Sequence, residues 1–479
     1  MSHPRQRRSG KSSGRSGHRH PGHRQAPAAR PDMVEQQLTL EIDSLNSEGQ
    51  GVARRGRDVY FVPGALAGET VDVQLDGRRK KIWYTRLRNV VKASPDRTDS
   101  GCAHYHRCGG CDMQHLSYDA QVKAKQARVE REFQRQHIDV EQWAEPITAD
   151  PWHYRRKARL GVRFSKADER NFIGFREAAS SHISDIDHCP VLVDHPVLNW
   201  QAWRDCIGAL SGRDRISQIE VVAADNALAL VLRELKPLSG DDRQKLCDFI
   251  ETFSGQGKPL QLWLKGDRGY DCLYPPSAPE TLFHRVQNLE LTMALDDFIQ
   301  VNAEVNGRMV DQALTWLQPQ SDETIWDLFA GHGNFSMPLA KCSQHVTAVE
   351  VQDSMVSSLK RQSEKLALPL LGTKADLSQP ECLAGLSQPD AVLLDPPRAG
   401  AAEVCAELIR RPVPRVVYVS CDVATLARDL AQLTAAGYRI VKAGIMDMFP
   451  QTHHVETMVL LRYPSDSVKT RNKKKISES

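Results

Sequence analysis

Two side chains near the C-terminal end of the sequence could carry out covalent chemistry together. Cys421 follows an apolar run at residues 416–420, and Glu456 closes the segment Phe-Pro-Gln-Thr-His-His-Val-Glu at residues 449–456. A thiolate can add to a carbon, and a carboxylate can remove a proton. Taken singly, the cysteine also fits a small buried hydrophobe, and the glutamate also fits a surface carboxylate. Their joint placement at strand ends favours catalysis.

The elements that must position this pair form an alternating pattern. From about residue 290 onward, apolar runs typical of strands alternate with helical runs, which predicts a doubly wound parallel sheet. The expected strands are residues 324–329, 345–350, 391–395, 415–420, 438–446 and 455–462. Because such a sheet binds ligands beyond the carboxyl ends of its strands, we expect a ligand site at that edge.

A glycine-bearing loop predicts a nucleotide-type cofactor at this edge. Gly331 and Gly333 follow the first expected strand and open a helix, so the backbone there can approach a ligand closely. Glu350 ends the next strand, where a carboxylate can bind the two hydroxyls of a ribose. Phe329 is a candidate for lining the pocket, and Asp376 for meeting an adenine edge. The sequence lacks the Gly-x-x-x-x-Gly-Lys-Ser/Thr motif, which argues against a triphosphate hydrolase.

Asp395 ends the expected strand at 391–395 and is followed by two prolines and Arg398. The prolines fix a rigid turn that projects the carboxylate into the cleft. Turns of this kind suit a site where a planar base is held beside a methyl donor. The motif equally fits a plain loop with a strand-capping aspartate, so by itself it leaves both interpretations open.

Methyl transfer to a pyrimidine ring would use all of these groups. C5 of uracil is too weak a nucleophile to take a methyl group directly, so a thiolate must first add at C6 and give C5 carbanion character. After the transfer, a base must remove the C5 proton so that the thiol can leave. We therefore predict that Cys421 is the nucleophile and Glu456 the base.

A second group of cysteines predicts a metal centre. The chain has 11 cysteines and no export signal, which argues against a disulfide framework. Cys102, Cys108 and Cys111 lie on a glycine-bearing loop, and Cys189 precedes a proline. Four thiolates without an open position fit a 4Fe-4S cluster or a structural zinc. Because a zinc site usually has two Cys-x2-Cys pairs and this loop has one, we favour the iron–sulfur cluster.

The N-terminal part of the sequence predicts a small β-barrel. Apolar residues alternate in short runs between residues 33 and 94, with glycines between the runs. The last run, residues 78–88, places cations among Trp83 and Tyr84, as a surface that stacks on bases and holds a phosphate backbone would. An edge strand protected by charges is the alternative, and the composition favours nucleic acid.

Composition and charge restrict the class of protein. The chain has 479 residues, 41% hydrophobic and 26% charged, which fits a globular protein of two or three domains. Residues 1–31 carry seven Arg and one Lys without an acid, which leaves 55 basic against 60 acidic residues elsewhere. These basic ends are typical either of arms that bind phosphates or of solubilising tails. The sequence shows no apolar stretch of membrane-spanning length, and we expect a cytoplasmic monomer.

The motifs resemble those of the RNA uracil-C5 methyltransferases. They are Phe-Ile-Gln-Val-Asn at 298–302, Asp-Leu-Phe-Ala-Gly-His-Gly-Asn-Phe at 327–335, Asp-Pro-Pro-Arg-Ala-Gly at 395–400, Ser-Cys-Asp at 420–422 with Thr-Leu-Ala-Arg-Asp at 425–429, and Asp-Met-Phe-Pro-Gln-Thr-His-His-Val-Glu-Thr at 447–457. Residues 41–69 resemble a TRAM domain, which is an RNA-binding barrel, and the cysteine loop resembles the iron–sulfur motif of this family. The resemblance covers about residues 35–463.

The resemblance implies S-adenosylmethionine as methyl donor and assigns roles by matching positions. The residues that would contact this cofactor or the target base are Gln300, Phe329, Asn334, Glu350, Asp376 and Asp395. The ligands of the 4Fe-4S cluster would be Cys102, Cys108, Cys111 and Cys189. Departures from the family pattern are Ala330 in place of Cys, Asp422-Val423 in place of Asn-Pro, and Ala67 in place of Pro.

A barrel together with the cysteine loop implies the branch of the family that modifies 23S ribosomal RNA. The transfer-RNA branch resembles this chain only over the catalytic part, and a second ribosomal branch has the cluster without the barrel. Other functions stay open: a different 23S or transfer RNA site, or an RNA-binding protein without catalysis. Radical methylthiotransferases combine a TRAM domain with Cys-x3-Cys-x2-Cys, whereas the first gap here is five residues.

The expected fold class is therefore α/β with three folded domains. A TRAM barrel would span residues 33–95, a central α+β domain with the iron–sulfur loop residues 96–290, and a Rossmann-like methyltransferase domain residues 291–464. Basic tails at 1–32 and 465–479 would flank them, the first of these disordered.

Overall fold

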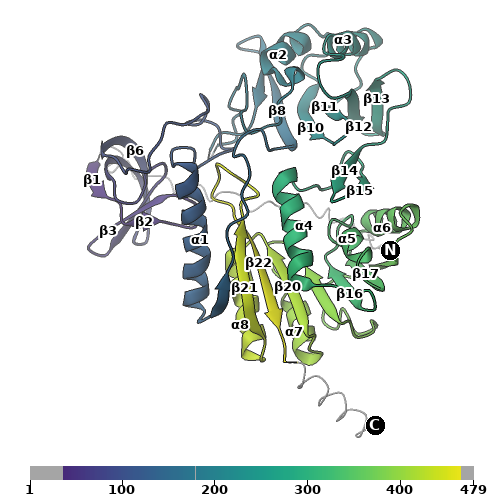
Figure 1. Ribbon diagram of the computed structural model, residues 1–479. Helices are drawn as coiled ribbons and strands as arrows, with labels where there is room; N and C mark the ends of the chain where they lie inside the picture. The colour runs from purple at the N-terminus through teal and green to yellow at the C-terminus, as the bar shows by residue number, and fades with distance from the viewer. Residues whose placement is uncertain (1–35, 179, 465–479) are drawn as a thin grey trace, which may run out of the picture.

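The computed structural model describes residues 36–178 and 180–464, so the two predicted basic tails lie outside the described residues. Three β-sheets of six, six and eight strands, joined by a short hairpin, organise this part of the chain. Figure 1 shows the N-terminal sheet beside helix α1, the central sheet at the top and the C-terminal sheet below. The fold is of the α/β class, as the sequence predicts.

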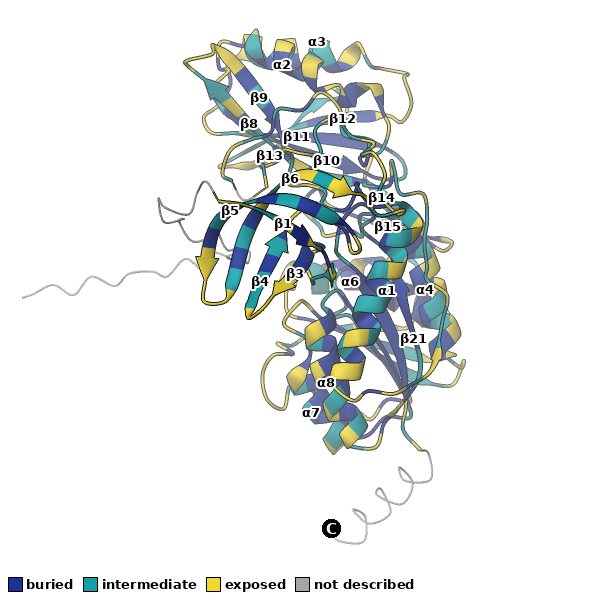
Figure 2. Cartoon of the chain, turned by 90° about the vertical axis from the view of Figure 1, so that its left-hand side faces the viewer, coloured by how far each residue is buried: buried dark blue, intermediate teal, exposed yellow. Residues whose placement is uncertain are grey.

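The N-terminal sheet is rolled around its own core. Its strands are β1 (Gln37–Glu41), β2 (Ser44–Leu45), β3 (Gly51–Arg55), β4 (Asp58–Val62), β5 (Thr70–Arg79) and β6 (Ile82–Lys92), in the order β1-β5-β6-β4-β3-β2. The two edge strands follow each other directly in the chain, and the sheet is strongly curved (Figure 2). Along β5, Val71, Val73 and Leu75 alternate inward with period two and form the core.

A buried carboxylate fixes the exit from this sheet. Glu69 accepts hydrogen bonds from the Leu66 and Ser94 backbone amides and from two nitrogens of Arg97. Burial opposes ionisation of Glu69, but the Arg97 and backbone donors outweigh it and lower its pKa. Since Arg97 also donates to the Gly64 carbonyl, one ion pair ties the sheet to the start of the cysteine loop.

The central sheet has the order β13-β12-β11-β10-β8-β9 and carries helices α2 (Trp200–Gly208) and α3 (Gly240–Glu251) over one face. Its strands are β8 (Lys157–Ser165), β9 (Arg170–Gly174), β10 (Ile216–Ala223), β11 (Leu228–Glu234), β12 (Leu260–Gly266) and β13 (Gly269–Tyr274). A 3-10 turn, η2 (Pro196–Leu198), precedes α2. The hairpin of β14 (Phe283–Val286) and β15 (Leu289–Thr292) leads into the C-terminal sheet.

The C-terminal sheet has eight strands in the order β18-β17-β16-β19-β20-β22-β21-β7. They are β7 (Val140–Trp143), β16 (Thr324–Leu328), β17 (His345–Glu350), β18 (Leu370–Lys374), β19 (Ala391–Leu394), β20 (Arg415–Ser420), β21 (Arg439–Met446) and β22 (Glu456–Arg462). The strands expected from the sequence are confirmed to within one residue at each end. Strand β7, together with α1 (Tyr118–Arg135), reaches this sheet from the segment before the central sheet, where β7 pairs with β21.

The expectation of a wholly parallel sheet is wrong at one strand. β22 runs antiparallel to both β20 and β21, between which it lies. The reason is the connection: β21 returns to β22 through a short loop at 447–455 without a crossover helix, and only antiparallel strands can be joined in that way. The β21–β22 loop therefore lies at the carboxyl ends of β16, β19 and β20 (Figure 1).

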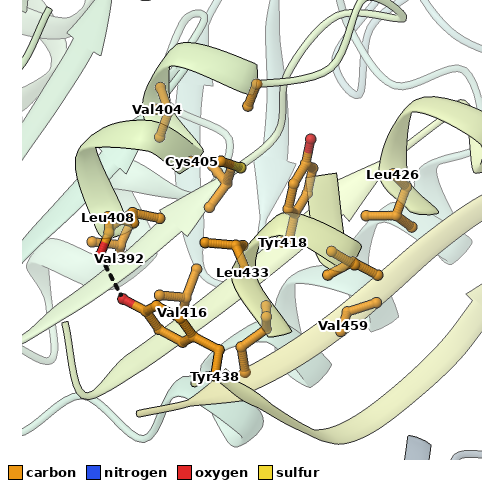
Figure 3. Close-up of a cluster of buried hydrophobic side chains, with 14 of the residues drawn as sticks. Val392, Val404, Cys405, Leu408, Val416, Tyr418, Leu426, Leu433, Tyr438 and Val459 are labelled. Atoms are coloured by element: carbon orange, nitrogen blue, oxygen red, sulfur yellow. Dashed lines mark hydrogen bonds between the residues drawn. The ribbon is translucent and has the colours of Figure 1, made fainter. Parts of the chain in front are cut away.

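Helices cover both faces of the C-terminal sheet. Helices α1, α7 (Ala402–Arg410) and α8 (Val423–Ala435) contribute buried side chains to one core, and α4 (Ala303–Leu317), α5 (Ser336–Ala340) and α6 (Asp353–Lys365) contribute to the other. Figure 3 shows the first core, in which Cys405 packs among Leu408, Tyr418 and Leu433. The Tyr438 hydroxyl donates to the Leu408 carbonyl, which satisfies a polar group inside this core.

The close approach of two chain segments at Gly174 yields a test of the central sheet. A Cβ atom at this position would lie 1.9 Å from the Ser184 carbonyl oxygen, a backbone atom that cannot move aside. We expect Gly174→Ala to destabilise the sheet by about 3 kcal/mol or more. Gly208→Ala, at the end of α2 with open space around it, should be neutral or stabilising by up to about 1 kcal/mol. Hydrogen exchange of peptides from β8 and β9 measures both, and equal protection in the two variants would contradict this packing.

Candidate active site

The register of β20 against β22 brings the predicted nucleophile and base together. Ser420 pairs with Thr457, so the next residue of each strand end, Cys421 and Glu456, lie opposite each other at the carboxyl edge. Both line one cavity of about 470 Å³. The lining residues are Arg155, Phe298, Gln300, Asp395, Pro396, Pro397, Arg398, Cys421, Phe449, Thr452, His454 and Glu456. Sequence alone could not place Cys421 and Glu456 in one cavity, because their register depends on β22.

The electrostatics of the cavity are dominated by buried carboxyl groups. Glu456 is 7% exposed, and burial followed by repulsion from Asp395 raises its pKa to about 8, against the attraction of Arg398. Burial likewise raises the pKa of Asp395 to about 7. The Cys421 thiol has its pKa raised to about 12 by burial, Glu456 and Asp395, with Arg398 again opposing. At neutral pH a carboxyl with a pKa near 8 is mostly protonated, and its ionised fraction is a stronger base than an ordinary carboxylate.

Asp395 and Gln300 reach this cavity from different elements. Asp395 follows β19, and its backbone amide donates to the Leu328 carbonyl at 3.3 Å, which holds the Asp-Pro-Pro turn against the end of β16. Gln300 lies in the segment before α4, where the Arg156 guanidinium donates to its carbonyl at 2.8 Å. The two polar side chains therefore flank Cys421 and Glu456 in one cavity, in which a planar ring could be held.

The glycine loop after β16 has the backbone geometry of a close ligand approach. Phe329, Gly331 and Gly333 have positive φ angles of 64°, 55° and 104°, and Phe329 is strained there because it carries a side chain. The buried Glu350 carboxylate accepts hydrogen bonds from the backbone amides of Gly331, Val351 and Gln352. These hydrogen bonds fix the Glu350 carboxylate beside the glycine loop, which is the position that the sequence predicts for it.

The remaining two predicted cofactor residues differ in their setting. Asn334 exchanges two side-chain hydrogen bonds with Asn306 of α4, at 2.9 and 3.0 Å, so its amide is fixed in orientation. Asp376 is exposed in the loop after β18, where its carboxylate accepts from Ser378 and Gln379. Hydrogen bonds from these two residues hold the pKa of Asp376 below its usual value. Neither residue lines the cavity of Cys421.

Sequence reasoning missed a set of contacts that fix the β21–β22 loop. The buried Lys125 ammonium of α1 donates to Asp447 at 2.6 Å and to the Phe449 carbonyl at 3.1 Å. Gln121 of α1 donates to the Gln451 side chain and accepts from the Gln451 amide. The loop thus depends on a helix more than 300 residues away in the chain, and Lys125 and Gln121 gave no signal beyond their polarity within a helical stretch.

The cysteine loop contacts the same segment. The backbone amides of Asp112 and Met113 both donate to the Gln451 carbonyl, and the Asp112 carboxylate accepts from the His453 amide at 2.8 Å. Asp112 follows Cys111, one of the predicted cluster ligands. The cysteine loop and the loop that carries His454 and leads to Glu456 are therefore packed as one unit.

A neutral histidine pair fixes the glycine loop from its other side. His332, between the two glycines, lies with its Nε2 atom 3.1 Å from Nε2 of His284 in β14. Burial is the main cause that lowers the pKa of both imidazoles, to about 4 for His332 and to about 2 for His284. Both rings are neutral at physiological pH, so one can donate to the other. The sequence motif contained His332, but its partner had no detectable pattern.

The four predicted cluster cysteines line one small cavity. Its volume is about 90 Å³, and Cys102, Cys108, Cys111 and Cys189 all face it, together with Arg155, which also lines the Cys421 cavity. Burial and the neighbouring thiols raise the pKa of Cys111 to about 12 and that of Cys189 to about 11. Within the described ranges, 36–178 and 180–464, no three His, Cys, Asp or Glu side chains are arranged to hold a metal ion.

Comparison with known proteins identifies the family. Residues 117–366 and 386–463 match the model described as tRNA (Uracil-5-)-methyltransferase, and residues 31–81 match the TRAM domain model. The chain belongs to the tRNA (uracil-5-)-methyltransferase family. It is therefore an enzyme, an RNA (uracil-C5)-methyltransferase, and its N-terminal sheet corresponds to a TRAM domain.

Close relatives extend over most of the chain. Proteins called 23S rRNA (uracil(1939)-C(5))-methyltransferase RlmD from Hahella chejuensis and Pseudomonas fluorescens are 39% and 41% identical to it. The alignments cover 90% and 88% of this chain and 98% and 93% of those relatives. The crystal structure of Pyrococcus abyssi tRNA (uracil-54, C5)-methyltransferase in complex with S-adenosyl-L-homocysteine aligns with a TM-score of 0.69 at 23% identity, covering 88% of this chain and 99% of that chain, and shows the same fold.

In the part of the chain that the structure describes, no helix combines the length and apolar character needed to cross a bilayer.

The raised pKa of Glu456 predicts a pH-dependent change in stability. The folded state keeps the Glu456 proton up to about pH 8, whereas the unfolded chain releases it near the ordinary value of 4.5. Between these limits the unfolded state binds fewer protons, so this group makes the protein less stable as the pH rises. We expect Glu456→Gln to raise the melting temperature relative to the native protein at pH 9 and to leave it unchanged at pH 4.5. An equal difference at both pH values would contradict the raised pKa.

Proposed function

We propose that this protein forms 5-methyluridine at a specific uridine of 23S ribosomal RNA, with S-adenosylmethionine as methyl donor and a covalent bond between Cys421 and C6 of the uracil. The observation that carries the mechanism is the register of β20 and β22, which puts Cys421 and Glu456 in one cavity. The ribosomal substrate is supported by the relatives named as 23S rRNA methyltransferases, which match almost their whole length. Methylation of another 23S site or of a transfer RNA is the alternative.

The residues around the glycine loop fit S-adenosylmethionine. A Cβ atom at Gly331 would meet nothing within 4 Å, so this turn faces open space, and the fixed carboxylate of Glu350 is available beside it for ribose hydroxyls. Phe329 and Asn334 would border the cofactor, and Asp376 would approach its adenine edge. When bound, S-adenosylmethionine supplies an electrophilic methyl group.

The side chains of the cavity would divide the reaction into steps. The Cys421 thiol first loses its proton to solvent; the thiolate sulfur then bonds to C6, and the electron pair of the C5–C6 double bond moves toward C5 and the ring carbonyl. Once C5 carries a methyl group, the Glu456 carboxylate takes the C5 proton, the double bond forms again and the bond from sulfur to C6 breaks. Arg398 stabilises the thiolate electrostatically, because it opposes the rise in the pKa of Cys421.

Gln300 and Asp395 would hold the uracil in the orientation that these steps require. Their side chains line the same cavity, and the pKa of Asp395 near 7 leaves a fraction of this group protonated at neutral pH. A protonated carboxyl can donate a hydrogen bond to a ring carbonyl, and the Gln300 amide can both donate and accept. The polar edge of the ring would thus be recognised by two groups fixed at the ends of different elements.

We further propose that Cys102, Cys108, Cys111 and Cys189 hold a 4Fe-4S cluster. All four face one cavity, and four cysteine thiolates are the usual ligand set of such a cluster. The cluster would bind the cysteine loop to the turn at Cys189 and so stabilise the contacts of Asp112 with the β21–β22 loop.

The TRAM sheet would act as an RNA-binding barrel. Its two edge strands are consecutive in the chain, and exposed Arg86 and Arg88 of β6 would contact the phosphate backbone. The three proposed domains are residues 33–95, 96–290 and 291–464, with α1 and β7 of the second domain packed on the third. We propose that the protein works as a monomer in the cytoplasm, where its RNA substrate is made.

A covalent trap tests the mechanism and the substrate together. With a 23S RNA fragment containing 5-fluorouridine, the missing C5 proton should prevent elimination, so that protein and RNA stay joined in a denaturing gel. Cys421→Ser should form no adduct, whereas Cys342→Ser, which changes an exposed cysteine away from the cavity, should form it normally. Glu456→Gln should accumulate an adduct even with natural uridine. An adduct with transfer RNA but not with 23S RNA would contradict the proposed substrate, and an adduct in Cys421→Ser would contradict the nucleophile.

The proposed iron–sulfur cluster is tested by a separate measurement. Protein purified without oxygen should contain about four iron and four sulfide per chain and show the visible absorbance of an iron–sulfur cluster. Cys189→Ser should lose this absorbance, whereas Cys206→Ser, at another partly buried cysteine outside the cavity, should keep it. One zinc ion per chain without iron would instead support the structural zinc.

A further inference from the structure

A second cavity lies on the other side of the β21–β22 loop. Its volume is about 270 Å³, and its walls come from residues 43–49 of the TRAM sheet, from α1 and from His453. We call it the flanking cavity, with Asn46, Gly49, Arg128, Arg131 and His453 among its lining residues. His453 faces this cavity, whereas the next residue, His454, faces the cavity of Cys421. One loop therefore separates the two cavities.

The charges around the flanking cavity leave a positive excess. Lys125 is paired with Asp447 at 2.6 Å, and Asp43 with Arg54 at 3.6 Å. His453 is hydrogen-bonded to Asp112.

Two further cations line the cavity without such a partner. Arg128 donates one hydrogen bond to the His453 carbonyl at 3.1 Å. Within residues 36–178 and 180–464, no carboxylate forms an ion pair with Arg128 or Arg131. The flanking cavity thus offers two guanidinium groups that are not neutralised.

Burial of the Arg128 guanidinium in the flanking cavity is unfavourable in the absence of an anion. Burial lowers the pKa of Arg128, and the carboxylates of Asp422 and Glu132 counteract this only in part, while Arg131 adds repulsion. Arg128 is half-buried, and its one hydrogen bond, to the His453 carbonyl, leaves most of its donors without a protein partner in the described residues. An anion in the flanking cavity would accept from these donors, and the planar donor fork of arginine matches a phosphate group.

We propose that the flanking cavity binds the phosphodiester of a nucleotide next to the target uridine, in a single-stranded stretch of RNA. This proposal rests on the proposed function, because the target uracil must enter the Cys421 cavity. To reach that cavity a base has to leave its stack, and a backbone that crosses the β21–β22 loop would place the neighbouring phosphate at the flanking cavity. On its other side the loop meets Arg128 and Arg131. The TRAM sheet, which contributes residues 43–49, would then fix the flanking nucleotide relative to the site of chemistry.

The test uses Arg131 because it is exposed and supports no other element through a hydrogen bond, unlike Arg128. We compare Arg131→Gln with Lys123→Gln, which removes an exposed cation of the same helix that lines neither cavity. Binding of a 23S RNA fragment is measured over a range of salt concentrations. Arg131→Gln should lower the slope of log K against log salt by about 0.7 and weaken binding about fourfold at 0.15 M salt. Lys123→Gln should change both quantities much less.

Replacing one phosphate at a time with an uncharged group identifies the phosphate that Arg131 contacts. Methylphosphonates are introduced one at a time beside the target uridine. At one position the substitution should weaken binding to the native protein by the same factor as Arg131→Gln, and it should cause no further loss in that variant. Losses that add at every position, or equal losses in the Arg131 and Lys123 variants, would overturn the flanking cavity as a phosphate site. If the native protein binds the RNA but forms no 5-fluorouridine adduct, the proposed mechanism fails while the phosphate site can still be tested; if it binds no RNA, both fail.

Discussion

The antiparallel insertion of β22 between β20 and β21 is the constraint on which the active site depends. In a purely parallel sheet, all strands run in one direction. The residue that follows one strand and the first residue of its neighbour therefore lie at opposite ends of the strands. Reversal of one strand puts the start of β22 at the carboxyl edge, so that Glu456 meets Cys421 there. The proposed nucleophile and the proposed base are thereby fixed by the hydrogen-bonded register of two strands, more rigidly than by a loop.

The reversal requires a tight loop, and much of the surrounding structure stabilises it. The β21–β22 loop contains Gln451 in a left-handed conformation with φ of 68°, which is strained for a residue with a side chain. Gln121 and the amides of Asp112 and Met113 hold that residue in place, and the buried pair of Lys125 with Asp447 fixes the start of the loop. Removing one partner of such a buried pair typically costs about 3–5 kcal/mol, because a charge is left without compensation.

This arrangement explains why three sheets are present in an enzyme whose chemistry needs only one. Helix α1 and the cysteine loop hold the β21–β22 loop from one side, and the hairpin β14-β15 holds the glycine loop through His284. The TRAM sheet borders the same β21–β22 loop through the flanking cavity. Elements outside the catalytic sheet thus position both the proposed cofactor site and the proposed nucleophile. The proposed iron–sulfur cluster would act on the β21–β22 loop indirectly, through Asp112.

The sequence by itself determined the strands and the chemical groups. Apolar runs predicted six of the eight strands of the C-terminal sheet to within one residue, since burial on both faces demands continuous apolar side chains, whereas β7 and β18 were not predicted. The motifs identified Cys421, Glu456 and Asp395 as well as the four cysteines, because each chemistry allows few residue types. Only the tertiary structure decided the direction of β22, the joining of α1 and β7 to the last sheet, and the contacts of Gln121 with Gln451. These contacts link residues more than 300 positions apart, and no local periodicity records which distant polar groups a folded chain will bring into hydrogen-bonding distance.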